Sequence, residues 1–146
     1  MMQKSLFLIG ALFFNGLVNA QTLTIEITDV RNSNGHLLLG IYTNDKDYQD
    51  RIAIQKKTVL KTNLIDGKVT TTIEGLKPGI YGVALMDDEN WDRKMEFKFL
   101  FPKEGFAFSN YYLESYRKPH FKDFKFELGK EGKKVTMRCK YLYKEE

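Results

Sequence analysis

The chain has 146 residues, a formal net charge of +4 at pH 7, 14% aromatic residues and a single cysteine. This length allows one domain, and a charge surplus this small and scattered argues against a nucleic-acid-binding protein. One cysteine excludes an internal disulfide framework, so packing alone must hold the fold together.

The N-terminus predicts export. Residues 1–4 carry a positive charge, residues 5–14 are apolar, and Val18-Asn19-Ala20 is a small-x-small cleavage signal. We therefore predict a signal peptide over 1–20 and one secreted or periplasmic domain over 21–146. The apolar run is shorter than the ~20 residues of a membrane span, and no later segment is long enough either. The residue directly after the cleavage site is not a cysteine, so a lipid anchor is not expected.

Strand periodicity begins directly after this segment. Apolar and polar residues alternate over 23–28, and Asn32-Ser33-Asn34-Gly35 predicts a turn into a second strand over 36–42. The polar residues 44–50 predict a loop or a single helical turn. A third strand is predicted over 58–61.

The middle of the chain continues this pattern. Asp66-Gly67 predicts a hairpin into a strand over 69–73, and Pro78-Gly79 predicts a turn. The strand over 80–86 is nearly all small or apolar, which predicts burial of both faces. Gly82 within it indicates a close approach by another part of the chain.

Alternating apolar residues return in the last third. Phenylalanine occupies 97, 99 and 101, apolar residues occupy 124, 126 and 128, and a final strand is predicted over 133–143. In that strand Cys139 has the parity of the apolar face, which predicts a small buried hydrophobe and not a reactive thiol. Short strands, frequent turns and no helical period predict an all-β fold, an antiparallel β-sandwich of about seven strands.

Four short sequence elements follow one another along the chain: L-x-P-G-x-Y at 76–81, D-E-N-x-D at 88–92, P-x-E-G-x-x-F-S-N at 102–110 and P-x-F-x-D at 119–123. With this order and spacing the chain resembles a bacterial exported family named domain of unknown function 2141 (DUF2141). The resemblance implies an immunoglobulin-like or prealbumin-like sandwich, and no biochemical role is established for the family.

The chain departs from the family pattern around the D-E-N triplet. Family members usually have His before it, where this chain has Asp87. They often have Gly where this chain has Trp91 and Arg93. Where they have a later Asp, this chain has Glu96, and where they have a Gly two residues before the Pro, it has Leu100.

Oxygen-bearing side chains in the acidic loop (residues 88–96) have the spacing of the first half of an EF-hand: Asp88, Asn90, Asp92 and Glu96. This spacing suits a hard cation, so calcium is a candidate ligand. Arg93 stands where an EF-hand has Gly, and Phe99 stands where it has a bidentate Glu. The alternative is a loop held by Asx-turns and ion pairs to Arg93 and Lys94.

Aromatic residues lie within the acidic loop and after it: Trp91, Phe97, Tyr111, Tyr112 and Tyr116. Aromatic faces beside acids and amides suit sugars, because the rings stack on CH faces while the polar groups bind hydroxyls. We therefore predict ligand binding by Trp91, Glu104, Ser109 and Asn110, with an envelope glycan or protein as partner. The alternative is that most of these rings belong to the core.

Catalysis is less well supported. Ser109, His120 and Asp123 are the residue types of a triad, and Asp88 with Glu104 could act as an acid–base pair on a glycan. Common residues at loose spacing are weak support for either. Ser109 more plausibly caps a turn, His120 packs beside its proline, and Glu104 binds neighbouring backbone amides.

The sequence thus favours an exported, monomeric, non-catalytic binding or interaction module. It would present the acidic loop and the Glu104–Asn110 segment (EGFAFSN). The alternatives are a periplasmic hydrolase acting on glycans and a purely structural domain with a calcium-stabilised loop.

Overall fold

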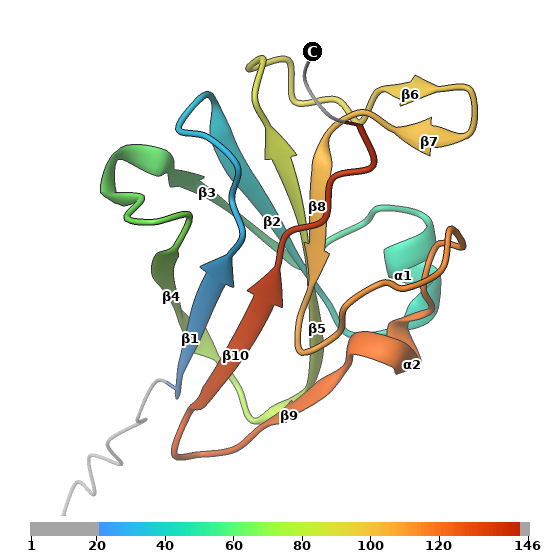
Figure 1. The fold of residues 1–146 in the computed structure, drawn as a ribbon. Coiled ribbons are helices and arrows are strands. Elements are labelled where there is room, and N and C mark those ends of the chain that lie inside the picture. The colour runs from blue at the N-terminus through green and yellow to red at the C-terminus, as the bar shows by residue number, and fades with distance from the viewer. Residues whose placement is uncertain (1–20, 144–146) are drawn as a thin grey trace, which may run out of the picture.

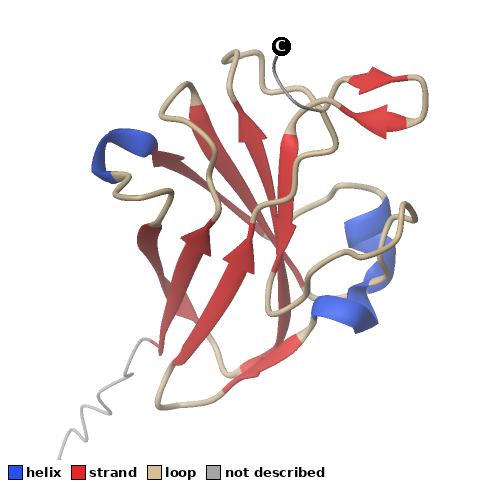
Figure 2. Cartoon of the chain, viewed as in Figure 1, coloured by secondary structure: helices blue, strands red, loops and turns tan. Residues whose placement is uncertain are grey.

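The computed structural model describes residues 21–143; the predicted signal peptide lies outside them. Strands dominate this part of the chain (Figure 2). The elements in order are β1 (Gln21–Thr28), β2 (His36–Tyr42), α1 (Asp45–Gln49), β3 (Gln55–Leu60), the 3₁₀ turn η1 (Lys61–Asn63), β4 (Val69–Leu76), β5 (Gly79–Asp88), β6 (Phe97–Lys98), β7 (Phe101–Pro102), β8 (Gly105–Phe108), α2 (Phe121–Phe124), β9 (Phe126–Leu128) and β10 (Lys133–Arg138).

These strands form three sheets (Figure 1). One has the order β10-β1-β4, a second has the order β3-β2-β5-β8 with β9 also paired to β5, and β6 and β7 form a separate hairpin. Neighbours are antiparallel, as predicted, with one exception. β1 and β10 run parallel, with Ile25 opposite Val135. The described residues form ten strands and not about seven, partly because the predicted strand around 97–101 is a short hairpin.

The main hydrophobic core draws its residues from both larger sheets. The alternation in β1 places Leu23, Ile25 and Ile27 in it with no exposed surface, and β2 contributes Leu37 and its alternate neighbours. The predicted burial of Cys139 is confirmed at 4% exposure. Burial raises the pKa of its thiol to about 12, so the side chain is a packed hydrophobe at neutral pH.

A second cluster covers the other face of the five-stranded sheet. It is rich in aromatic rings: Tyr42, Tyr48, Phe106, Phe108, Leu113, Phe121 and Phe124. The close approach predicted at Gly82 is made by a ring, because a Cβ there would lie 2.6 Å from Phe124 Cε2. Glycine therefore allows α2 to pack on β5.

The two short helices are capped differently, α1 by a neighbouring residue and α2 with the help of a distant one. The helical turn predicted at 44–50 is confirmed as α1, where Asn44 Oδ1 accepts a 2.9 Å hydrogen bond from Asp47 N. The strand predicted to include Phe124 is shorter than expected, because α2 precedes it. Asp45 Oδ1 accepts a 2.7 Å bond from Phe121 N, 76 positions away, so a distant residue helps to cap α2. No helix of the described residues has the length and apolar character to cross a bilayer.

Candidate functional site

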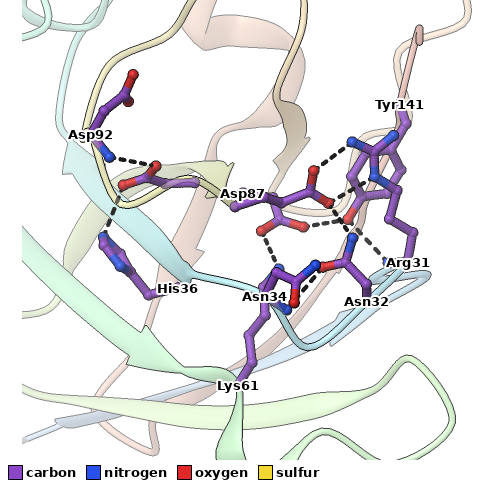
Figure 3. A network of polar contacts seen from close by, with 10 residues as sticks. Arg31, Asn32, Asn34, His36, Lys61, Asp87, Asp92 and Tyr141 are labelled. Carbon is purple, nitrogen blue, oxygen red and sulfur yellow. Dashed lines mark hydrogen bonds and ion pairs between the residues drawn. The ribbon is translucent and has the colours of Figure 1, made fainter. Parts of the chain in front are cut away.

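The acidic loop is closed from inside by Asp88. This residue ends β5 and is fully buried. Its Oδ1 accepts a hydrogen bond from Asp92 N at 3.2 Å, and its Oδ2 accepts one from Arg93 N at 2.9 Å. The same Oδ2 lies 3.1 Å from His36 Nε2 (Figure 3). Both carboxylate oxygens therefore have partners within the protein.

The other predicted calcium ligands are also engaged. Asn90 Oδ1 accepts from Asp92 N at 3.2 Å, Asp92 Oδ1 accepts from Lys94 N at 2.8 Å, and Glu96 pairs with Lys103 at 3.0 Å. These contacts include the Asx-turns of the alternative interpretation, but the ion pair is made by Lys103, while Arg93 and Lys94 contribute only backbone N–H groups. Calcium coordination by this set would require the loop to give up these contacts. Across residues 21–143 no group of three or more His, Cys, Asp or Glu side chains could hold a metal ion.

Two residues of the acidic loop have left-handed backbone conformations. Trp91 has φ of 65° and Arg93 has φ of 59°. A non-glycine residue in this region costs roughly 1–2 kcal/mol. Trp91 is 60% exposed, and its ring centroid lies 4.4 Å from that of His36, so it covers the buried histidine.

The Glu104–Asn110 segment lies mostly inside the protein. Its strand, β8, is buried at every position. Glu104 is 6% exposed, and its Oε2 accepts a 2.7 Å hydrogen bond from Glu96 N, which confirms the predicted contact with backbone amides. Burial raises the pKa of Glu104, although the backbone bonds act in the opposite direction.

Ser109 links β5 to α2 inside the fold. It is fully buried; its Oγ accepts a 2.9 Å bond from Val83 N and donates a 2.7 Å bond to Phe124 O. The expectation that it caps a turn was wrong, because both of its partners lie on distant elements. Asn110 is exposed, and its Oδ1 accepts from Thr136 N at 3.0 Å. Of the four predicted ligand-binding residues, Trp91 and Asn110 reach the surface, whereas Glu104 and Ser109 do not.

The candidate catalytic residues have separate partners. Ser109 bonds to the backbone, while the His120 ring lies 3.4 Å from Asp45 on α1. Asp123 Oδ2 accepts from the backbone N of His120 at 2.8 Å, which caps α2 and does not orient the imidazole ring. These contacts assign helix-capping and strand-linking roles to the three side chains.

A buried ion pair beside the acidic loop was not predicted from sequence. Lys61 of η1 is 3% exposed and Asp87 of β5 is fully buried, with Lys61 Nζ 2.5 Å from Asp87 Oδ1 (Figure 3). Tyr141 Oη donates a 2.6 Å bond to Asp87 Oδ2. Burial raises the pKa of Asp87, and the contacts with Lys61 and Tyr141 oppose that effect. The only sequence signal was Asp87 itself, at the position where relatives have His.

A bidentate pair lies next to this ion pair. Arg31 Nε and Nη2 donate to the two oxygens of Glu89 at 2.7 and 2.5 Å, and Asn32 Nδ2 donates to the same carboxylate at 2.9 Å. The Arg31 guanidinium also lies 4.5 Å from the centroid of the Tyr141 ring. Burial acts to raise the pKa of Glu89, but Arg31, Lys61 and Asn32 together hold it below its usual value. We call Arg31, Lys61, Asp87, Asp88, Glu89 and their partners His36 and Tyr141 the polar network.

A groove lies on the outer face of the five-stranded sheet. Its volume is about 620 Å³, within the usual range for small-molecule sites. Strand alternation puts half-buried residues on its floor, such as Leu38 and Gly40 of β2 and Ala84 and Met86 of β5. Aromatic rings of the second cluster form one side, and the acidic loop and the β6–β7 hairpin contribute further lining residues: Tyr42, Tyr48, Phe106, Phe108, Arg93, Met95, Phe97, Leu100 and Pro102.

The charged residues of this groove are all basic. Five cations line it, and no Asp or Glu does: Arg51, Lys56, Lys57, Arg93 and Lys118. Lys118 Nζ lies 4.5 Å from the centroid of the Tyr48 ring. Desolvation, followed by the nearby charge of Arg51, lowers the pKa of Lys118. A positive potential therefore surrounds an apolar floor.

Fold and site together define a small, mostly β protein that combines a charge-compensated polar network with an apolar, basic groove. A family model matches residues 25–136, and its description is an uncharacterized protein conserved in bacteria, DUF2141. The chain belongs to this family, which confirms the resemblance seen in its sequence. No curated protein and no solved structure matches the chain.

Proposed function

We propose that this chain is an exported, non-catalytic binding module that uses the groove on the five-stranded sheet as its binding site. Its scaffold would be an immunoglobulin-like or prealbumin-like β-sandwich, supported by the core shared between the two larger sheets. The observation that carries the binding proposal is the groove itself. It is concave, large enough for a small ligand and lined mainly by apolar and aromatic side chains.

Exposed apolar residues beside the groove support the same proposal. Phe99 and Leu100, at the tip of the β6–β7 hairpin, are 90% and 88% exposed, and Phe97 and Tyr116 are 52% and 77% exposed. Leu100, Phe97 and Tyr116 also line the groove. Clustered exposed apolar side chains mark interaction sites more often than isolated ones do. The acidic loop takes part through Arg93 and Met95, and not through its carboxylates.

Binding of a neutral apolar fluorophore tests this proposal. N-phenyl-1-naphthylamine should bind saturably, with increased emission, because the groove removes it from water. Ala84→Phe should fill the floor of the groove and abolish the signal. Thr70→Phe, at an exposed position of β4 on the other sheet, is the matched control and should bind normally. An equal response of both variants and the parent protein would rule out the groove as the site.

A further inference from the structure

The groove combines an apolar floor with cations that have no acidic partner. Ion pairs of the described residues involve Lys46, Lys61, Lys103, Lys134, Arg31, Arg138 and two histidines. Among the described residues, no salt bridge joins Arg51, Lys56, Arg93 or Lys118 to a carboxylate. The fifth groove cation, Lys57, donates to the backbone carbonyl of Thr72. Charge is thus compensated in these ion pairs but not around the groove.

The nearby carboxylates are committed to other contacts. Asp45 and Asp50 are close enough to influence Lys118. Asp45, however, accepts the backbone N–H of Phe121, and Asp50 pairs with Lys46 at 2.5 Å. Arg51 and Lys118 therefore form a like-charged pair at the helical end of the groove, and their mutual repulsion would be relieved by an anion.

We propose that the groove binds single-chain amphiphiles with an anionic head group, the head lying against Arg51 and Lys118 and the hydrocarbon chain on the β2–β5 floor. This inference rests on the proposed function and names its ligand class. A hydrocarbon chain matches the side chains of Leu38, Met86 and Phe106, which offer no hydrogen-bonding groups. A carboxylate or phosphate head group matches the unpaired cations, with which it forms charge-assisted hydrogen bonds.

The test compares two ligands that differ only in the head group. Dodecanoate and dodecan-1-ol would each be titrated against the complex of the purified protein with N-phenyl-1-naphthylamine. Dodecanoate should displace the fluorophore at roughly tenfold lower concentration, because hydrogen bonds to charged groups contribute more than neutral ones. This preference should shrink as ionic strength rises.

Variants then assign the preference to named residues. Arg51→Gln with Lys118→Gln should remove the preference for dodecanoate over dodecan-1-ol, and an unchanged far-UV circular dichroism spectrum and urea unfolding midpoint show that the fold is intact. Lys130→Gln with Lys133→Gln makes the same change in net charge at two exposed positions, in the turn before β10 and at its first residue, and should keep the preference. Displacement by the two ligands at equal concentrations would overturn the inference, as would an equal loss of the dodecanoate preference in both double variants. Either result would leave the groove as a binding site. Failure of the fluorophore to bind would instead remove the proposed function itself.

A final arm separates a free amphiphile from a membrane surface. Sedimentation with phosphatidylglycerol vesicles, with phosphatidylcholine vesicles as control, reports attachment to a bilayer. We expect monomeric dodecanoate to displace the fluorophore at concentrations that form no micelles. If the protein sediments with phosphatidylglycerol vesicles but monomeric dodecanoate does not displace the fluorophore, a single-molecule site is contradicted.

Discussion

The polar network and the groove use charged side chains in opposite ways. In the network every charge lies against a partner, as Lys61 does against Asp87 at 2.5 Å; Asp87 and Asp88 are fully buried, and Glu89 is partly buried. Around the groove four of the five cations are exposed, Lys57 being half-buried, and no carboxylate occurs among the lining residues. A charge compensated inside the protein contributes to the fold, whereas an exposed and uncompensated set is available to a ligand. The difference supports a structural role for the acidic end of β5 and the binding role that we propose for the outer face of the sheet.

The largest effect should follow from breaking the buried pair of the network. Lys61→Met leaves Asp87 buried without its cation, and removing one partner of a buried pair typically costs about 3–5 kcal/mol. The double variant Lys61→Met with Asp87→Leu should recover most of that loss. Urea unfolding measures both free energies of unfolding. If the single variant keeps parental stability, the pair is not the structural element assigned to it.

A second effect concerns the acidic loop and calcium. Asp88→Ala leaves the N–H of Arg93 without its acceptor and the N–H of Asp92 with Asn90 alone, which should lower the free energy of unfolding by about 1–3 kcal/mol. We expect the melting temperature of the parent protein to be the same in chelator and in millimolar calcium, because internal groups already use the loop oxygens. A calcium-dependent rise that Asp88→Ala removes would establish the calcium site predicted from sequence.

The pH dependence of stability provides a smaller test of the network. The pKa of Glu89 is lowered in the folded protein, so its pairing with Arg31 contributes above the unfolded pKa and is lost as pH falls through the folded value. Glu89→Gln should therefore be destabilising at pH 7, and the difference from the parent should begin to shrink near the ordinary Glu pKa of about 4.3 and vanish once the pH is below the lowered folded pKa. Glu74→Gln, at an exposed position of β4, should show no such trend. A difference that grows with acidity would have the wrong sign for this account.

The smallest predicted effect lies on the groove side and separates stability from binding. Arg93→Gly should raise the free energy of unfolding by about 1 kcal/mol, because glycine adopts a φ of 59° without a steric penalty. The same change should weaken dodecanoate binding, since it removes a groove cation. Arg93→Lys, which keeps the charge and the backbone strain, is the control and should leave both quantities near parental values. A gain in stability with unchanged binding would remove Arg93 from the groove.

Local patterns were sufficient to predict much of the fold. Alternation identified β1 and the burial of Cys139, and the polar run after β2 identified α1, because these features depend on residues close in sequence. The parallel pairing of β1 with β10 could not be predicted, since it joins strands from opposite ends of the described chain and has no local turn signal. The same applies to α2, which Asp45 helps to cap from 76 positions away.

The candidate site was harder to predict because burial of a polar side chain depends on distant partners. Ser109 looked accessible in sequence, yet Val83 and Phe124 approach it from other elements. Lys61 resembled an exposed strand residue, and only the fold places Asp87 beside it. The groove is likewise assembled from β2, β3, β5, β8 and several loops. Its cations are scattered along the sequence, so their convergence on one surface has no sequence pattern.

Amide NMR titration with dodecanoate tests the central claim most directly, because it locates the ligand on the surface of the intact protein. We predict saturable shifts at the groove floor, at Gly40, Ala84 and Met86, and at the cationic end around Arg51, with no change at Lys61 or Asp87. Shifts confined to the polar network, or no saturable shifts at all, would contradict the account.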